Sequence, residues 1–170
     1  MIHGKGKLQS GLVTLKAGVL VRYRGRVLLI RERNNRTRRY AWNIIKGTFE
    51  HTKDESILAT AVREAREEAN AIVKLRYLIG TYYLLDTGRA LLMFAFIADL
   101  MDPRVAIAPK KLQMKYRLGE DIVEIRFFTK AQLSILRPKD FIGMRGYLVV
   151  RDYLAGRRFS LSAIHTLPPK

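Results

Sequence analysis

Three glutamates in one short segment have the residue type and the spacing that metal-assisted phosphate chemistry requires. Glu64, Glu67 and Glu68 are spaced by three and four residues, which places them on one side of a helix. Three like charges on adjacent turns repel one another and destabilise the helix unless a positive group lies among them. Mg²⁺ prefers carboxylate oxygens and also binds substrate phosphates, so a magnesium site would explain the cluster.

The same segment differs in charge from the rest of the chain. The 170 residues include 32 Lys and Arg against 15 Asp and Glu, a net charge of +17, yet six of the acids lie between Glu50 and Glu68. A helical acidic face that pairs with local arginines is the simpler alternative, because Arg63 stands four residues before Glu67 and Arg66 lies beside it. The spacing of the wider segment favours the metal site.

The segment from Gly47 to Ala71 resembles the Nudix box. That box consists of a Gly, five residues, a Glu, seven residues, Arg-Glu, an aliphatic residue, any residue, Glu-Glu, any residue, a Gly and an aliphatic residue. The chain follows this order with Glu55, a seven-residue interval, Arg63-Glu64, Ala65 and Glu67-Glu68. The preceding hairpin, Trp42 before Lys46-Gly47, and residues 120–128 also resemble Nudix domains, although only the box is diagnostic.

The segment departs from the family pattern at two places. Seven residues instead of five separate Gly47 from Glu55, so the loop that enters the helix is two residues longer. Asn70 replaces the closing glycine, a mild change because asparagine tolerates the left-handed conformation. The longer loop is a place where metal number or substrate could differ from the family, whereas the helix carboxylates stay in register.

The resemblance implies an enzyme: a Mg²⁺- or Mn²⁺-dependent hydrolase that cuts a pyrophosphate bond in a nucleoside diphosphate linked to another group. Arg63 would orient the carboxylates, with Glu55 as its partner across the loop. The catalytic base would be a box glutamate, Glu64 or Glu67, or an acid from a distant loop, for which Glu120 is the candidate. The metal ligands that the resemblance implies are Glu64, Glu67, Glu68 and the carbonyl of Gly47.

Arginines before the box are the candidates for binding substrate phosphates. Arg36, Arg38 and Arg39 lie in a segment that runs near the substrate cleft in Nudix folds, and guanidinium groups suit phosphate oxygens. Simple exposure to solvent is the alternative. Four aromatic side chains could stack on a base, although strand aromatics more often lie in the core: Tyr77, Tyr82, Tyr83 and Phe128.

The positive charge favours a phosphate-rich partner. Basic residues cluster within residues 22–46, 103–119 and 137–158, although a basic composition of the source organism is an alternative explanation. We expect a nucleotide or polyphosphate substrate, with a dinucleoside polyphosphate, a nucleoside triphosphate or the 5′ end of an RNA ahead of a nucleotide sugar. The alternative function is a Nudix domain that binds RNA or a ribonucleoprotein with little or no hydrolysis. A homodimer is possible, since Nudix proteins are often dimers.

Composition excludes several other classes of site. The chain has no cysteine, so disulfides and thiolate metal sites are impossible, and its three histidines are scattered. No run approaches the roughly 18 apolar residues of a membrane span, and the first residues lack the apolar stretch of a signal peptide. We therefore expect a cytoplasmic protein without a membrane partner, whose metal is held by oxygen.

The hydrophobic patterning predicts one α/β domain with partly antiparallel sheets. The resemblance sharpens this to a Nudix fold, with mixed β-sheets between α-helices, over residues 1–170 with a core of about 12–155 and a tail of about 156–170. The helix of the box is predicted from Asp54, as N-cap, to Ala69, with Asn70 left-handed after its last turn. Two further helices are expected at Lys130–Leu136 and Met144–Leu154. The predicted strands are Gly18–Tyr23, Val27–Ile30, Ala41–Ile45, Ile72–Tyr77, Ile79–Leu85, Leu91–Ala98 and Val123–Phe128.

Overall fold

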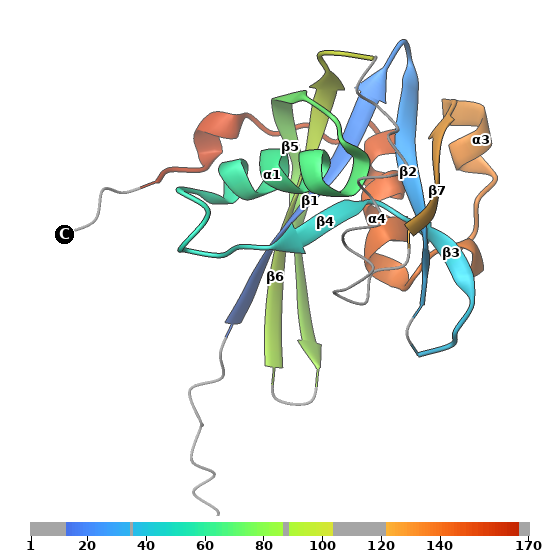
Figure 1. Ribbon diagram of the computed structural model, residues 1–170, viewed down its shortest axis with the longest axis horizontal. Helices are drawn as coiled ribbons and strands as arrows, with labels where there is room; N and C mark the ends of the chain where they lie inside the picture. Colours follow the sequence, from blue (N-terminus) through green and yellow to red (C-terminus); the bar gives the residue numbers. More distant parts are fainter. Residues whose placement is uncertain (1–12, 35, 87–88, 104–121, 167–170) are drawn as a thin grey trace, which may run out of the picture.

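A mixed β-sheet with helices on both faces forms the body of the protein (Figure 1). The computed structural model describes residues 13–34, 36–86, 89–103 and 122–166. Its strands are β1 (Val13–Tyr23), β2 (Arg26–Arg33), β3 (Tyr40–Asn43), β4 (Ile45–Thr48), β5 (Val73–Asp86), β6 (Arg89–Leu100) and β7 (Ile122–Phe128). Its helices are α1 (Ile57–Ala69), α3 (Lys130–Ser134) and α4 (Met144–Leu154), with 3₁₀ turns at Pro138–Asp140 and Leu161–Ala163.

The sheet has the order β3-β2-β1-β6-β5, with β4 added to β1 and β7 added to β2. The β1–β6 pair is parallel, whereas the other strand pairs are antiparallel. This confirms the expected α/β class with a mixed sheet between helices.

Successive side chains of β1 point to opposite faces of the sheet and contribute to two core layers. Val19 and Val21 face α1, together with the small residues Ala61 and Ala65 of that helix. Leu20 points to the opposite face, which α3 and α4 cover. Because successive side chains of a strand point to opposite faces, one apolar strand supplies both layers.

Helix α1 begins two residues later than predicted. Its N-cap is Ser56, whose side chain accepts a hydrogen bond from the Ala59 amide, and Asp54 lies in the preceding loop. The predicted end of the helix is confirmed, because Asn70 adopts φ 50° and its backbone N–H donates to the Ala65 carbonyl. The helix bounds that matter for the carboxylates therefore follow from local sequence.

Strand breaks differ from the prediction at two places. The single strand expected over residues 41–45 is split into β3 and β4, since β3 pairs with β2 whereas β4 pairs with β1. The two strands expected over residues 72–85 form one long strand, β5, whose register shifts near Tyr77 and Gly80 as it follows β6. Both outcomes depend on pairing with strands that are distant in sequence.

The C-terminal segment expected as a tail packs against the body in part. Phe159 exchanges two backbone hydrogen bonds with Leu78, at 2.9 and 2.8 Å. Leu161 and Ile164 lie against the core layer beneath α1. Among the described residues, no helix has the length and apolar character needed to cross a membrane.

Candidate active site

The three box glutamates lie on α1 with very different exposure. Glu64 and Glu68 are buried, with 4% and 0% of their surface exposed, whereas the Glu67 side chain is 41% exposed. Burial of a carboxylate is costly unless polar groups surround it. Glu64 and Glu68 are therefore packed inside the protein, whereas Glu67 faces solvent beside them.

Gly47 on β4 gives the Glu64 carboxylate the space that it occupies. A Cβ atom at Gly47 would lie 1.8 Å from the Glu64 carboxylate carbon, so no other residue fits without displacing that group. The close approach of backbone to carboxylate is a reason for glycine at this position. The structure thus places the Glu64 carboxylate directly against the backbone of Gly47.

Arg63 lies at the centre of the acidic cluster. Its Nη1 donates to Glu64 Oε1 at 2.6 Å and to Glu67 Oε2 at 3.1 Å, so the two carboxylates converge on one nitrogen. Its Nη2 also donates to the Thr48 carbonyl, at 3.0 Å, in the strand that carries Gly47. The orienting role expected for Arg63 is consistent with these contacts.

The carboxylate that holds Arg63 in place is Asp54, and not Glu55 as predicted. Asp54 accepts from Arg63 Nε at 2.8 Å and from Nη2 at 2.9 Å, a two-point pair, whereas Glu55 is exposed. The longer loop turns Asp54 inward, where it also accepts from the Glu50 amide and the Thr60 hydroxyl. A carboxylate with this many donors replaces the box glutamate as the partner of Arg63.

The electrostatics of this pair match its geometry. The hydrogen bonds from Arg63 lower the pKa of Asp54 to about 2, with further contributions from the Glu50 amide and the Thr60 hydroxyl. The same hydrogen bonds, followed by the charges of Glu64 and Glu67, raise the pKa of Arg63. Both groups are therefore charged throughout the physiological pH range.

Glu68 connects the cluster to a second polar network. Its Oε2 accepts a hydrogen bond from the Lys46 backbone N–H at 3.1 Å. The Lys46 side chain forms an ion pair with the buried Glu32 at 3.0 Å, and Asn43 donates to the same Glu32 oxygen at 2.7 Å. Lys46 is thus bound by Glu68 through its backbone and by Glu32 through its side chain. The Glu68 contact fixes strand β4 beside α1.

The donor chemistry of the cluster fits a hard divalent cation. Every candidate ligand is an oxygen, and Glu64 and Glu67 already approach one positive group together. Among the described residues no three acidic or histidine side chains form a finished metal cage. Arg63 contacts both Glu64 and Glu67, and Glu67 is the more exposed of the two.

The remaining predicted site residues lie apart from this cluster or outside the described residues. Arg36, Arg38 and Arg39 are exposed in the connection between β2 and β3. Glu120 and the basic residues 104–119 lie outside the described residues. Of the four aromatic candidates, Phe128 is buried, Tyr77 and Tyr82 pack against the core beneath α4, and Tyr83 is 66% exposed.

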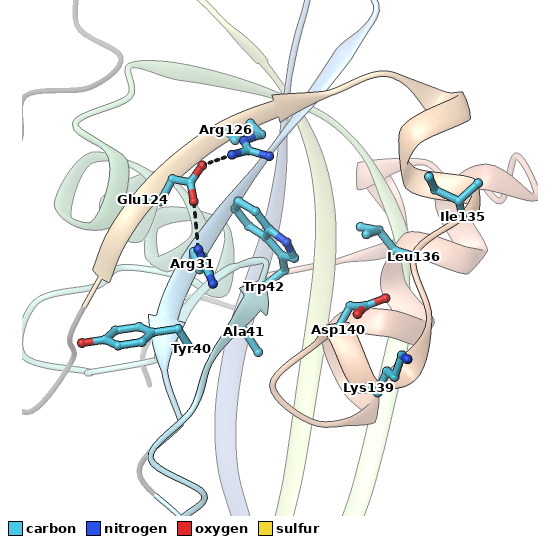
Figure 2. A pocket seen from close by; sticks show the side chains of 10 residues that line it. All are labelled: Arg31, Tyr40, Ala41, Trp42, Glu124, Arg126, Ile135, Leu136, Lys139 and Asp140. Carbon is cyan, nitrogen blue, oxygen red and sulfur yellow. Dashed lines mark hydrogen bonds and ion pairs between the residues drawn. The ribbon is translucent and has the colours of Figure 1, made fainter.

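A pocket of about 510 Å³ lies on the other face of the sheet, beside α3 (Figure 2). Trp42 and Tyr40 of β3, Arg31 of β2 and Arg126 of β7 line it. Sequence reasoning did not identify this pocket. The alternation of two aromatic residues on one short strand was the available signal, but the partner strands are distant in sequence.

Comparison with known proteins agrees with the fold. A family model described as the NUDIX domain matches residues 14–148. No curated protein is significantly similar to the chain.

Solved structures share the fold at low sequence identity. A NUDIX hydrolase from Nitrosomonas europaea superposes with a TM-score of 0.71 at 19% identity, over 92% of this chain and 98% of the other. A MutT protein from Methanosarcina mazei Go1 gives 0.60 at 16% identity, over 86% and 96% of the two chains. The NUDIX domain of Shewanella oneidensis NrtR, complexed with ADP ribose, gives 0.59 at 15%, over 87% and 89%. With the family model spanning most of its length and the acidic cluster of the box assembled on α1, the chain belongs to the Nudix family.

Proposed function

We propose that the protein is a Mg²⁺- or Mn²⁺-dependent hydrolase of a pyrophosphate bond in a nucleoside diphosphate linked to another group. The observation that carries the proposal is the convergence of Glu64 and Glu67 on one nitrogen of Arg63, with Glu64 seated against Gly47. Such an arrangement concentrates negative charge that attracts a divalent cation, and the same cation can bind substrate phosphates. Family membership supports the same reaction class.

The residues proposed to hold the cation are Glu64, Glu67, Glu68 and the backbone of Gly47. A divalent cation bound there would neutralise the phosphate charge and lower the pKa of a water. Arg63 positions Glu64 and Glu67, and Asp54 fixes the guanidinium group from the other side. The longer loop therefore preserves this positioning through a different acid.

The reaction adds one water across one anhydride bond. The water oxygen bonds to phosphorus, the bridging P–O bond breaks, and the bridging oxygen leaves with the second phosphate product. We propose Glu67 as the acceptor of the water proton, because its side chain is 41% exposed whereas Glu64 is buried. A base must reach the proton of its water, which a solvent-facing carboxylate can do.

The chain's positive charge supports a highly charged substrate. Arg36, Arg38 and Arg39 are all exposed, and none forms an ion pair with another described residue. Their guanidinium groups are therefore available to phosphate oxygens in the part of the chain that the structure describes. We propose them as the phosphate-binding residues outside the acidic cluster.

Phosphorus NMR of a substrate panel tests the proposal. The panel contains ADP-ribose, a diadenosine polyphosphate, nucleoside triphosphates and a 5′-triphosphorylated RNA, each with Mg²⁺. We expect the native protein to cleave at least one compound and Glu67→Gln to cleave none. Glu50→Gln changes a half-exposed acid that pairs with Lys53 in the loop before α1, so it serves as the matched control and should retain turnover.

The alternative function is binding of RNA or a ribonucleoprotein with little or no hydrolysis. The observation that favours it is the exposed arginine-rich connection between β2 and β3. RNA retention that falls steeply with salt and survives Glu67→Gln, together with no turnover of the panel, would replace the hydrolase by this alternative.

A further inference from the structure

Glu32 is a buried acid on the sheet that takes no part in the proposed reaction. It is the only acidic residue in strands β1 to β4, and its charge is balanced by an ion pair with Lys46. Buried ion pairs are often no more stabilising than apolar side chains of similar volume. The stability of the fold alone therefore gives little reason for a carboxylate at this position.

The Glu32 carboxylate is held in one position by two donors. Its Oε1 atom accepts from Lys46 Nζ at 3.0 Å and from Asn43 Nδ2 at 2.7 Å. Asn43 is fixed in turn, because its Oδ1 atom accepts from the Ile44 amide at 3.0 Å. The Glu32 and Lys46 side chains are only 9% and 21% exposed, so solvent and salt screen their attraction less than that of a surface pair. The position of the Lys46 side chain is therefore well defined.

Lys46 connects this ion pair to the acidic cluster through its backbone. The Lys46 N–H donates to Glu68 Oε2 at 3.1 Å, and Glu68 is fully buried. A hydrogen bond from a backbone amide restricts the direction in which a carboxylate points. Lys46 thus contacts Glu32 with its side chain and Glu68 with its backbone, and it directly precedes Gly47.

The ion pair joins two strands that share no ladder of backbone hydrogen bonds. Asn43 ends β3, which pairs with β2, whereas Ile45 begins β4, which pairs with β1. Among the described strands, β2 and β4 are not paired with each other. The side chains of Glu32 and Lys46 make the connection instead, so they contribute to the placement of the Lys46 amide opposite Glu68.

We propose that Glu32 is a positioning residue for the cation site: it holds Lys46, and the Lys46 amide orients Glu68. The inference rests on the proposed hydrolase function, in which Glu68 is a cation ligand. Arg63 contacts the other two glutamates from α1 itself, whereas Glu32 and Lys46 act on Glu68 from the sheet. Loss of a group that orients a metal ligand typically weakens metal binding by about tenfold to about 100-fold. Glu32 acts one contact further out, so we expect an effect near the lower end of that range.

Mn²⁺ binding to the substrate-free protein, followed by electron paramagnetic resonance, tests the proposal. Glu32→Leu keeps a side chain of similar size and removes the oxygen that Lys46 and Asn43 contact. We expect it to weaken Mn²⁺ binding by about tenfold. Glu32→Gln keeps an oxygen acceptor but loses the charge, so it should weaken binding by about threefold.

Asp99→Asn is the matched control, because it removes one negative charge from another ion pair of the sheet. Asp99 lies on β6 and pairs with Arg22 of β1 at 2.8 Å. Arg22 is four residues beyond Gly18, which is the partner of Lys46 in the β1–β4 ladder. This substitution changes the net charge as much as Glu32→Gln does, but it leaves the contacts of Lys46 in place. The Mn²⁺ affinity of Asp99→Asn should therefore equal that of the native protein.

Hydrogen exchange of the Lys46 amide, measured by NMR without metal, reads out the positioning directly. In Glu32→Leu this amide should exchange about tenfold faster than in the native protein, because its hydrogen bond to Glu68 opens more often. The Phe96 amide in the buried part of β6 is the internal reference for global stability. A greater acceleration at Lys46 than at Phe96 distinguishes a local change from a general loss of stability.

Native Mn²⁺ affinity in both Glu32 variants, or a Lys46 amide that accelerates no more than that of Phe96, would overturn the inference. The Glu32→Gln result decides alone if Glu32→Leu does not fold. Mn²⁺ binding that depends on Glu32, without turnover of any compound in the substrate panel, would contradict the proposed function and leave the positioning role standing.

Discussion

The acidic cluster on α1 and the pocket beside α3 are built in contrasting ways. In the cluster, buried carboxylates are tied by charged hydrogen bonds to one arginine, and the groups come from a single stretch of chain between β4 and α1. In the pocket, side chains from β2, β3 and β7 meet around one tryptophan, and the guanidinium groups remain partly exposed. The cluster is therefore held together within one stretch of chain, whereas the pocket exists only because strands distant in sequence come together.

The largest effect is expected where the cluster is most crowded. Gly47→Ala places a methyl group on the Glu64 carboxylate, which must move because the Cβ would lie 1.8 Å from its carbon. We expect Mg²⁺-dependent turnover to fall by about 100-fold, since small displacements in an active site have large effects on rate. Steady-state kinetics measure the loss, and circular dichroism checks that the fold is retained.

Gly80→Ala is the matched control for that substitution. A Cβ at Gly80 would lie 3.5 Å from its nearest neighbour, an ordinary contact on β5. Turnover by Gly80→Ala should equal that of the native protein. Native-like turnover by Gly47→Ala would show that Glu64 does not need its position against β4.

The next largest effect tests whether Asp54, as in the structure, or Glu55, as in the family pattern, is the partner of Arg63. Asp54→Asn removes the charge that holds Arg63 by two hydrogen bonds, whereas Glu55→Gln changes an exposed side chain. We expect Asp54→Asn to lower turnover by about tenfold and the free energy of unfolding by about 2 kcal/mol. Turnover assays and urea unfolding measure the two quantities. The reverse ranking, with Glu55→Gln the more damaging, would mean that the box glutamate is the partner after all.

Acid should weaken the cluster through the same residue. Folding lowers the pKa of Asp54 from 3.8 to about 2, so its ionised form stabilises the folded state above pH 4. That contribution, about 2 kcal/mol, is lost as the pH falls from 3.8 to about 2. Urea unfolding at a series of pH values should show a smaller loss for Asp54→Asn than for the native protein. Parallel curves for the two proteins would rule out Asp54 as the titrating group.

The smallest effect is expected on the face covered by α4. The Tyr82 hydroxyl donates to Asp152 of α4 at 2.8 Å, and burial followed by this hydrogen bond raises the pKa of Tyr82. Tyr82→Phe should lower the free energy of unfolding by about 1 kcal/mol without changing turnover. A loss of turnover in this variant, measured beside its urea unfolding curve, would mean that the two faces are coupled.

Local sequence was sufficient to predict the parts of the fold that position the carboxylates. The apolar spacing of α1 and the left-handed Asn70 follow from short-range rules, and the bounds predicted for α4 agree with the structure. The break between β3 and β4 did not follow from such rules, because it arises from a change of pairing partner between β2 and β1.

The site shows the same division. The three glutamates could be named from spacing and Gly47 from the resemblance to the Nudix box, and the structure places Glu64 against Gly47. The partner of Arg63 could not, because Asp54 and Glu55 are adjacent and the loop conformation decides which one turns inward. The pocket of Trp42 depends on strands that meet only in three dimensions.

Binding of Mn²⁺ without substrate, followed by electron paramagnetic resonance, tests most directly whether the acidic cluster is a cation site. The native protein and Glu50→Gln should bind Mn²⁺ equally, since the Glu50 side chain pairs with Lys53 and Glu50 contacts Asp54 through its backbone, which the substitution keeps. Glu67→Gln should weaken binding by about tenfold or more. Equal Mn²⁺ affinity in the native protein and Glu67→Gln would contradict the assignment of the cluster as the metal centre of a Nudix hydrolase.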